Sequence, residues 1–407
     1  MPSPTSDLHS PPNLAKRPLS EEKANATGAN RSGHDPGPAT MSRRWMLTVL
    51  CGAATVAISP RRGFATRISA AAQISGPSGD QINAWLEQMT LEEKVAHLFT
   101  VPVEGTALTP AEVEWLTATR PGGVILVEQN IGFAPELRAL IDEIHATNPT
   151  LPPLISVDQE GGLVTRLTSD PVPGPLELAV LPDDEVRDLA RVRGALLADF
   201  GFAINYAPVA DVAYGPDSFM TGRALGSDPA SVAGKVAAIV EGTNQTPVRA
   251  TAKHFPGHGR TTVDSHLALP EVQVAFEEWW ETDALPFRAA VEAGVPLIML
   301  GHLSYPTWDT LPTSLSPVAV EVLRQDLGFE GVIVSDDLGM DALSAYDPTT
   351  VVDLAIAAGL DCLLYVTPAV PITDLINHLI AQVESGAVPE ARIDDSVRRL
   401  LGLRHPA

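Results

Sequence analysis

Eight short apolar runs alternate with helical patterns between residues 99 and 366, and this alternation restricts the possible folds more than any other feature. The runs are rich in Val, Ile and Leu, as are parallel strands that are buried on both faces. They cover residues 99–103, 121–127, 154–158, 203–209, 246–252, 296–301, 331–335 and 362–366. Because helical segments separate them, the chain is predicted to form a single (β/α)8 TIM-type barrel of the α/β class.

Capping residues mark several of the helices between these runs. Thr90 and Glu93 form a capping box, and Thr109-Pro110 places an N-cap threonine before a first-turn proline. One helix is predicted to begin after Thr90 and another after Thr109. Further helices are predicted over residues 80–89, 134–146, 183–200, 228–243, 284–293, 316–327, 350–358, 372–383 and 393–403. No linker rich in Ser, Pro or Gly interrupts residues 80–405, so residues 73–407 are predicted to be one barrel domain.

The amino-terminal segment differs in composition from the rest of the chain. Residues 1–40 are rich in Pro, Ser, Asn and Gly, and we interpret them as disordered or as an over-predicted start before Met41. In residues 41–72, Arg43-Arg44 precedes an apolar run that ends near Ile58, which is typical of an export signal and resembles the twin-arginine type. Cleavage after Ala72 fits the small-residue rule, and an uncleaved membrane anchor is the alternative. The protein is therefore predicted to be exported and extracytoplasmic, either secreted or membrane-associated.

The charge balance is acidic, with 50 Asp and Glu against 27 Lys and Arg. Residues after 72 carry 18 basic and 46 acidic groups, a formal net charge of −28. Nucleic acid is therefore not predicted as a partner.

Cys51 lies in the apolar signal run, so a mature chain keeps only Cys362 and forms no internal disulfide. Neither a cofactor nor a stable protein partner is predicted, and we expect a monomer.

The segment from Lys253 to His266 reads K-H-F-P-G-H-G-R-T-T-V-D-S-H and follows the fifth apolar run. Asp264 and His266 are two positions apart, so in an extended segment they point the same way. The carboxylate would then accept a hydrogen bond from the imidazole and make it a tunable proton donor and acceptor. Two alternatives stay open at this stage, a structural histidine and a zinc site. The residues available for a zinc site are His254, His258, Asp264 and His266.

The run K-H-F-P-G-H-G followed by D-S-H resembles the signature of the bacterial β-N-acetylglucosaminidases of glycoside hydrolase family 3. The resemblance implies that His266 is the general acid/base and that Asp264 orients it. It also implies that Asp336, in the run S-D-D-L-G-M after the seventh apolar run, is the nucleophile, although a lone aspartate there would more often cap a helix. We predict structural roles for Asp337 and for His258, which has no catalytic match.

The same resemblance implies a set of sugar-binding residues at other strand ends. These are Asp158, Arg166, Arg223, Lys253 and His254. The alternatives are a glycine-rich turn with a salt-linked Asp and Arg, a lysine that merely pairs with a barrel carboxylate, and a packed histidine. The chain departs from the family at Leu163, where arginine is usual, and at Ala224-Leu225, where Ser-Phe is usual. Trp279 and Trp280 are predicted to pack and not to form a sugar platform.

The predicted function is that of a retaining exo-β-N-acetylhexosaminidase. By resemblance, its substrate is terminal non-reducing β-N-acetylglucosamine in saccharides or muropeptides from peptidoglycan. Asp336 would form a glycosyl-enzyme, while His266 would protonate the leaving oxygen and later deprotonate water. The alternatives are a glycoside phosphorylase on the same scaffold, a metal-dependent hydrolase and a non-catalytic wall-binding protein.

Overall fold

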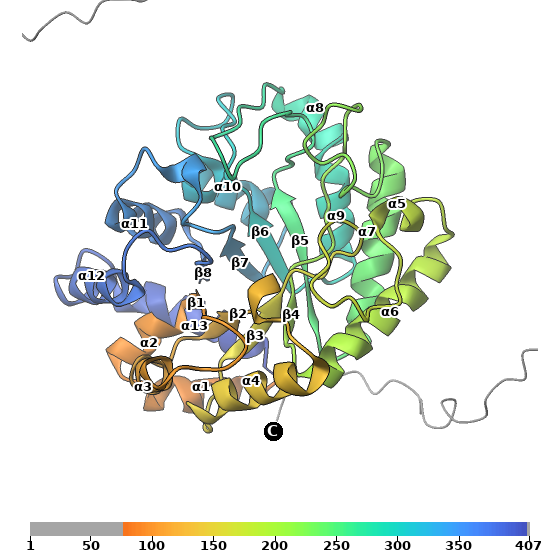
Figure 1. The fold of residues 1–407 in the computed structure, drawn as a ribbon. Helices are drawn as coiled ribbons and strands as arrows, with labels where there is room; N and C mark the ends of the chain where they lie inside the picture. The colour runs from red at the N-terminus through yellow and green to blue at the C-terminus, as the bar shows by residue number, and fades with distance from the viewer. Residues whose placement is uncertain (1–75, 405–407) are drawn as a thin grey trace, which may run out of the picture. The chain divides into compact units, whose positions relative to one another are not determined.

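A computed structural model describes residues 76–404, which form a ring of parallel strands surrounded by helices (Figure 1). The eight strands are joined in the order β7-β6-β5-β4-β3-β2-β1-β8. They are β1 (Phe99–Pro102), β2 (Gly123–Ile125), β3 (Leu154–Val157), β4 (Ile204–Asn205), β5 (Arg249–Phe255), β6 (Leu297–Leu300), β7 (Val332–Ser335) and β8 (Leu363–Leu364). A parallel bridge between Val334 and Cys362 joins β7 to the β8 segment. The predicted (β/α)8 barrel is therefore confirmed.

Most helices occupy the positions that the sequence predicts, with small differences at their ends. A short helix over residues 175–178 was not predicted, and the one over 276–281 had no predicted bounds. The helices are α1 (Gly79–Gln88), α2 (Leu91–His97), α3 (Pro110–Thr119), α4 (Ala134–Ala146), α5 (Pro175–Leu178), α6 (Asp183–Phe200), α7 (Pro229–Thr243), α8 (Phe276–Glu281), α9 (Ala284–Glu292), α10 (Pro317–Glu321), α11 (Pro348–Ala358), α12 (Ile372–Glu384) and α13 (Glu390–Gly402). Short helical segments are η1 (Glu128–Asn130), η2 (Thr313–Leu315), η3 (Val322–Asp326) and η4 (Asp341–Leu343). The helix predicted over 316–327 thus becomes α10 followed by the π-helical segment η3.

Local sequence explains where several helices begin and end. Thr90 and Thr109 each form a complete capping box with the glutamate three positions later. The helix α6 ends at Gly201, whose φ of 102° is left-handed and therefore favours glycine. These caps satisfy backbone groups that the helix ends would otherwise leave without partners.

Several strands are shorter than the predicted apolar runs, but one boundary difference matters for the site. The fifth run was predicted to end at residue 252, but β5 continues to Phe255. A register shift between Ala252 and Phe255 disturbs the pairing with β6 without ending the strand. Lys253 and His254 therefore lie on the barrel wall, on β5 itself, and not on the loop after it.

The hydrophobic core is continuous through the barrel and the helices around it. Strand residues such as Val101, Ile155 and Ile333 are fully buried. Trp279 is also buried, and its indole nitrogen donates to the Pro256 carbonyl at 2.7 Å, which agrees with the predicted packing role. Burial of large apolar side chains contributes about 1.5–3 kcal/mol each and provides the rigid frame on which the strand ends are placed.

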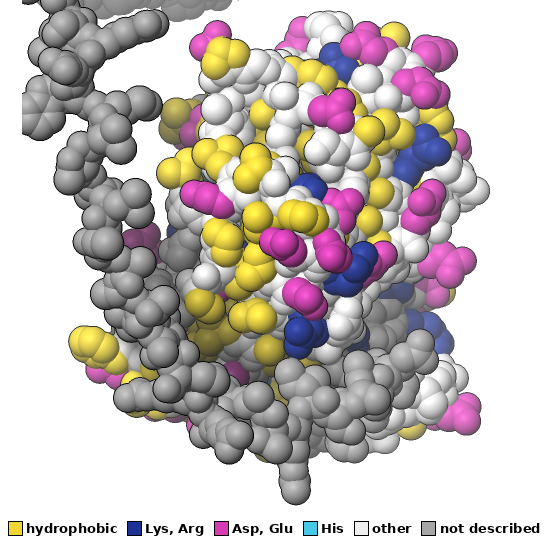
Figure 2. Space-filling view, turned by 90° about the vertical axis from the view of Figure 1, so that its right-hand side faces the viewer, with side chains coloured by type: hydrophobic (Ala, Val, Ile, Leu, Met, Phe, Trp, Pro, Cys, Tyr) yellow, Lys and Arg dark blue, Asp and Glu magenta, His cyan; other side chains and the backbone are white. Residues whose placement is uncertain are grey.

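On the side of the barrel where α6 and α7 lie, acidic side chains are interspersed with Lys and Arg (Figure 2). These two helices pack against each other, and Arg187 of α6 pairs with Glu241 of α7 at 2.5 Å. Both side chains of the pair are more than a third exposed, so it contributes little to stability.

The structure does not describe the predicted start over residues 1–40 or the predicted signal segment over 41–72. Within residues 76–404, no helix combines the length and the apolar character required to cross a membrane.

Candidate active site

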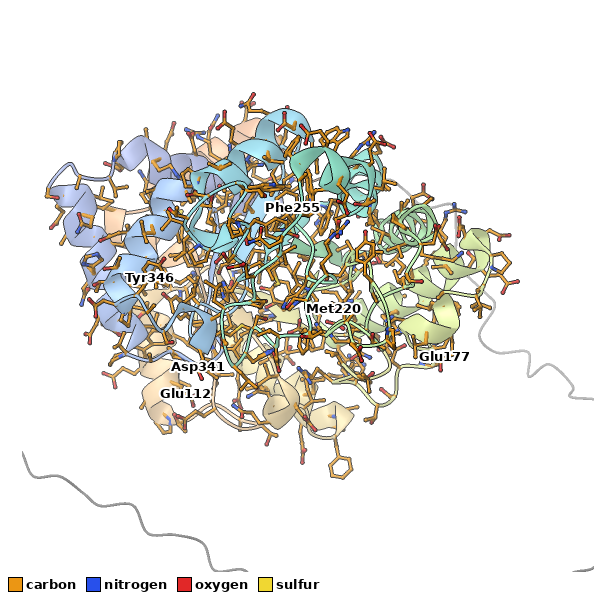
Figure 3. The ribbon with its side chains drawn as sticks, turned by 90° about the horizontal axis from the view of Figure 1, so that it is seen from above. Glu112, Glu177, Met220, Phe255, Asp341 and Tyr346 are labelled. Carbon is orange, nitrogen blue, oxygen red and sulfur yellow. The ribbon has the colours of Figure 1, made fainter. Side chains whose placement is uncertain are left out.

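A cavity of about 350 Å³ is lined by residues that follow several of the barrel strands. The carboxyl ends of the strands are where barrels of this type place their chemistry. Seven of the eight predicted site residues line this cavity: Asp158, Arg166, Arg223, Lys253, His254, His266 and Asp336. The eighth, Asp264, contacts His266 directly. Asp341, labelled in Figure 3, adds a further carboxylate to the wall from the loop after β7.

Asp336 directly follows β7, and its backbone amide donates to the Leu300 carbonyl of β6 at 2.9 Å. Its side chain accepts from the Asp337 amide at 2.9 Å. No helix begins here, because the next helical segment η4 starts at Asp341, so the helix-cap interpretation is wrong. Burial by itself would raise the pKa of Asp336, but nearby His254 and His302 and the Asp337 amide outweigh it and lower the pKa to about 2. An ionised carboxylate with an accessible oxygen is suited to nucleophilic attack.

Asp264 and His266 lie on the exposed loop after β5. The His266 Nδ1 atom is 2.7 Å from the Asp264 Oδ1 atom, which confirms the predicted contact. The segment is not extended, which was the condition considered, because the same Oδ1 accepts the His266 amide at 2.9 Å and the Leu267 amide donates to the Asp264 carbonyl. This Asx turn brings the two side chains together over two residues. Among residues 76–404, none forms a hydrogen bond with the His266 Nε2 atom, which would be available for proton exchange with a substrate.

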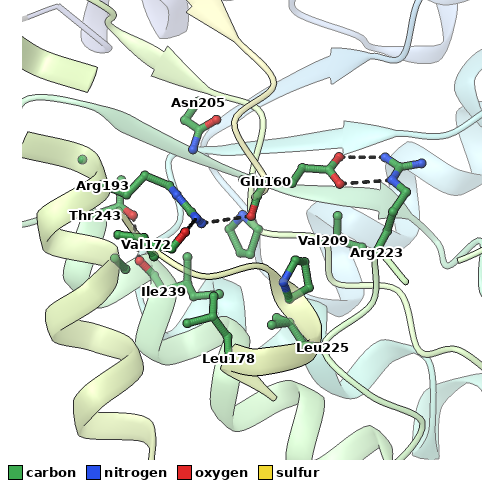
Figure 4. A pocket seen from close by; sticks show the side chains of 15 residues that line it. Glu160, Val172, Leu178, Arg193, Asn205, Val209, Arg223, Leu225, Ile239 and Thr243 are labelled. Carbon is green, nitrogen blue, oxygen red and sulfur yellow. Dashed lines mark hydrogen bonds and ion pairs between the residues drawn. The ribbon is translucent and has the colours of Figure 1, made fainter. Parts of the chain in front are cut away.

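Lys253 lies between two carboxylates on the cavity wall. Its ammonium is 2.6 Å from Asp158 and 2.8 Å from Glu160. Glu160 in turn accepts two hydrogen bonds from Arg223, at 2.7 and 3.0 Å (Figure 4). The alternative in which Lys253 pairs with a barrel carboxylate therefore describes its contacts correctly. The same ion pairs hold the charged groups of Lys253 and Arg223 at the wall of the cavity.

Glu160 was missed as a site residue, although it stands in the same D-Q-E-G-G motif as Asp158. Its side chain is 1% exposed. Burial alone would raise its pKa, but the charges of Lys253 and Arg223 lower the pKa to about 2. Arg193 also donates to the Glu160 carbonyl at 2.9 Å (Figure 4). The signal in the sequence is that Glu160 stands two positions after Asp158, and only the structure shows the two cations that it neutralises.

Asp211 is a second residue that the sequence prediction missed. It is fully buried, and its carboxylate accepts the His254 amide at 3.2 Å and contacts the His254 Nδ1 atom at 2.7 Å. The amide of His258 donates to Asp211 at 2.6 Å. Asp211 therefore fixes the orientation of the His254 ring, whose Nε2 atom remains for the cavity. The predicted packed alternative for His254 is incomplete, because this buried histidine also lines the cavity.

Arg166 differs from the other cations of the cavity. No residue among those described accepts a hydrogen bond from its guanidinium or pairs with it, and its Nε atom is buried without a partner. The salt link between Asp158 and Arg166 that the sequence left open is not present, since Asp158 pairs with Lys253. An unpaired guanidinium on a cavity wall can donate to hydroxyl or carbonyl oxygens of a bound ligand.

The neighbouring polar groups are occupied by structural contacts. The Asp337 carboxylate accepts from the amides of Gly339, Val366 and Thr367 and from the Thr367 hydroxyl. These bonds tie the loop after β7 to the segment after β8, which agrees with the structural role predicted for Asp337. His302 contacts Ser314 and the Asp337 carbonyl and is fully buried.

The metal alternative requires a cluster of ligands. Within residues 76–404, no group of three or more His, Cys, Asp or Glu side chains has an arrangement that could hold a metal ion. Among the four residues considered for zinc, His254 is engaged by Asp211 and His266 by Asp264.

Comparison with known proteins agrees with this geometry. Residues 90–403 match the N-terminal domain of glycosyl hydrolase family 3. The chain is 35% identical over 305 residues to a β-hexosaminidase of Hydrogenovibrio crunogenus, an alignment that covers 72% of this chain and 84% of that protein.

Two solved structures share the fold. A glycoside hydrolase family 3 β-N-acetylglucosaminidase from Paenibacillus sp. str. FPU-7 gives a TM-score of 0.74 at 35% identity and covers 77% of this chain, which spans only 62% of that one. LpqI of Mycobacterium tuberculosis gives a TM-score of 0.72 at 32% identity, covering 82% of this chain and 98% of its own. The matched domain fills nearly all of the barrel, and the chain therefore belongs to glycoside hydrolase family 3.

Proposed function

We propose that the protein is a retaining exo-β-N-acetylhexosaminidase that removes terminal non-reducing β-N-acetylglucosamine. One observation carries the proposal: an ionised aspartate, Asp336, and a carboxylate-held histidine, His266, line the same cavity. The names of the relatives, β-hexosaminidase and β-N-acetylglucosaminidase, support the sugar specificity.

In the first step, an oxygen of Asp336 attacks the anomeric carbon and forms an ester bond as the glycosidic carbon–oxygen bond breaks. His266 gives the proton on Nε2 to the leaving oxygen, so the departing group leaves as a neutral alcohol. Asp264 holds the opposite ring nitrogen and stabilises the imidazolium before the transfer.

In the second step, His266 takes a proton from water while the water oxygen attacks the anomeric carbon. The ester bond to Asp336 breaks, and the sugar is released with its original configuration after two inversions. The acid/base group is an imidazole in place of the second carboxyl group that most glycosidases use.

The sugar-binding role is proposed for the fixed cations and carboxylates of the wall. Asp158 and the unpaired Arg166 are suited to hydroxyl groups, while Lys253, His254 and Arg223 are held in place by buried carboxylates. A cavity of about 350 Å³ is near the small end of the range for ligand sites, which supports binding of one terminal sugar.

We further propose that the natural substrates are peptidoglycan fragments met outside the cytoplasm. The support is the segment around Arg43-Arg44 with its apolar run, which has the form of a twin-arginine export signal. Replacing both arginines with lysine should keep the protein in the cytoplasm of the producing cell, as measured by fractionation. Unchanged export would contradict the signal assignment.

The test of the activity is chromophore release from an aryl β-N-acetylglucosaminide beside the matching β-glucoside, with and without phosphate and a chelator. We expect release from the N-acetylated glycoside alone, unaffected by either addition. The Asp336→Asn variant should lose at least about 10⁴-fold in kcat. A sugar phosphate product would identify a phosphorylase instead, and binding without release would identify a wall-binding protein.

A further inference from the structure

The loop that carries His266 has one buried residue. Between residues 262 and 269, Ser265 is buried with 2% of its surface exposed, Asp264 is partly exposed, and the other six residues are exposed. A serine hydroxyl gains little from burial unless it forms a hydrogen bond. Ser265 forms that bond with His258, whose Nε2 atom lies 3.0 Å from the Ser265 Oγ atom.

Within the part of the chain that the structure describes, this bond is also the one polar connection between the loop and the barrel. The other hydrogen bonds of residues 262–269 are local, from Val263 to Thr261 and within the turn that Asp264 begins. In the described chain, no other hydrogen bond links residues 262–269 to a residue outside 261–270. A ring contact of 6.5 Å between Phe219 and His266 is the remaining aromatic contact of the loop.

His258 itself belongs to the rigid part of the site. Its amide donates to buried Asp211 at 2.6 Å, and its ring lies 5.0 Å from Phe219 and 6.0 Å from His254. The next residue, Gly259, is fixed through its carbonyl by the Ser218 hydroxyl at 2.8 Å. The anchor therefore joins the exposed loop to the same carboxylate that orients His254.

The direction of the bond follows from the burial of the ring. The Nδ1 atom of His258 is buried and has no partner within the described chain. A buried N–H without an acceptor costs more than a bare lone pair, so the proton belongs on Nε2 and is donated to Ser265. Burial also lowers the pKa of His258 to about 4, so the ring is neutral near pH 7.

We propose that His258 is a positioning residue for the acid/base, holding the His266 loop over the cavity through the Ser265 hydroxyl. The dyad of Asp264 and His266 is complete within its own turn, so losing the anchor leaves the dyad intact but lets the loop leave the cavity. This inference rests on the proposed function, in which His266 donates the proton.

The test compares two substrates of different leaving-group quality, by kcat/KM, which reports formation of the glycosyl-enzyme. The variants are Ser265→Ala and His258→Gln. The matched control is Thr262→Ala, which removes an exposed hydroxyl of the same loop that forms no hydrogen bond with any described residue. On an alkyl glycoside, both variants should lose about 2- to 10-fold, the effect of one hydrogen bond on the positioned population. On a dinitrophenyl glycoside, the dinitrophenolate leaves without needing a proton. The kcat/KM of both variants on this substrate should therefore match that of the parent and of the control.

A double variant and a parallel His266→Ala series separate the possible outcomes. If one bond carries the effect, Ser265→Ala combined with His258→Gln should lose no more than either change alone. Equal losses on both substrates, or additive losses, would show a general structural role and overturn the anchor. If His266→Ala itself fails to discriminate between the substrates, the acid/base assignment fails, and the positioning role that rests on it fails with it. If His266→Ala discriminates and the two anchor variants do not, only the anchor fails. Thermal unfolding of each variant checks that the fold is kept.

Discussion

The Nδ1 atom of His266 lies 2.7 Å from the Asp264 Oδ1 atom, and that oxygen also accepts the His266 amide at 2.9 Å. A single carboxylate oxygen thus holds both the ring and the backbone of the histidine. The side chain of His266 is 62% exposed and that of Asp264 is 33% exposed. The pair is therefore preformed on the surface turn and depends little on the barrel. In the proposed mechanism, proton transfer and nucleophilic attack would therefore come from structurally separate units, since Asp336 directly follows β7.

Replacing Asp264 with alanine should remove the carboxylate that orients His266 and stabilises its cation. We expect kcat/KM on alkyl β-N-acetylglucosaminides to fall about 10²-fold, the lower end of what acid/base assistance contributes. Activated dinitrophenyl glycosides should be affected much less. The comparison of kcat/KM across a series of leaving groups checks this, and a loss independent of the leaving group would contradict the orienting role.

The nucleophile should remain ionised at acidic pH. Because the pKa of Asp336 is lowered to about 2, its carboxylate is ionised at pH values well above that. In a His266→Ala variant, which has lost the proton donor, kcat/KM on a dinitrophenyl glycoside should be flat from pH 8 to about pH 4. Intrinsic fluorescence at each pH would verify folding. A decline with a midpoint near pH 5 in the folded variant would show that the attacking group titrates there and is not Asp336.

Replacing Glu160 with glutamine should destabilise the barrel strongly. The change leaves Arg223 without its carboxylate partner and Lys253 with one in place of two, at a cost of about 3–5 kcal/mol for a broken buried ion pair. Urea denaturation measures the free energy of unfolding.

The matched control for Glu160 is Glu241→Gln, which breaks the exposed pair with Arg187 and should cost less than about 1 kcal/mol. Similar losses in the two variants would refute the buried-cluster argument.

The contribution of Glu160 to stability should depend on pH. Since the pKa of Glu160 is lowered, the stability that its ionised form gives the folded chain is complete above its ordinary pKa and is lost as the pH falls from about 4.5 to about 2.

Stability should also fall at mildly acidic pH because of His97. This histidine is 3% exposed, and its Nε2 atom has no partner in the described residues. Burial, with the charge of Arg404, lowers its pKa to about 3. The unfolded chain therefore binds a proton that the folded chain excludes, so stability is complete above pH 6.5 and declines below it. From pH 7.5 to 5 the loss from this group is about 2 kcal/mol.

Urea denaturation at the two pH values checks the role of His97. A His97→Leu variant should lose about 2 kcal/mol less than the parent between them. An identical pH dependence in His97→Leu and the parent would show that another group is responsible.

Several site features could be predicted because they depend on short-range patterns. The apolar runs at 99–103 and 331–335 have the composition of buried parallel strands, and polar residues that follow such strands meet at one end of a barrel. The contact between Asp264 and His266 was predictable for the same reason, since it spans two residues. Its geometry was not, because an extended segment and an Asx turn both bring the two side chains together.

The sequence alone determined the alternation of strands and helices, the strand ends that carry Asp158 and Asp336, and the local pair on the loop after β5. Only the tertiary structure decided which charges meet. Asp211 reaches His254 across 43 positions, Arg223 reaches Glu160 across 63, and Lys253 reaches Asp158 across 95. These partners come from β5 and from the segments that follow β3 and β4. Each buried charge requires an opposite charge or a hydrogen bond wherever the fold places it. A linear pattern does not encode that choice, because it depends on the closure of the barrel.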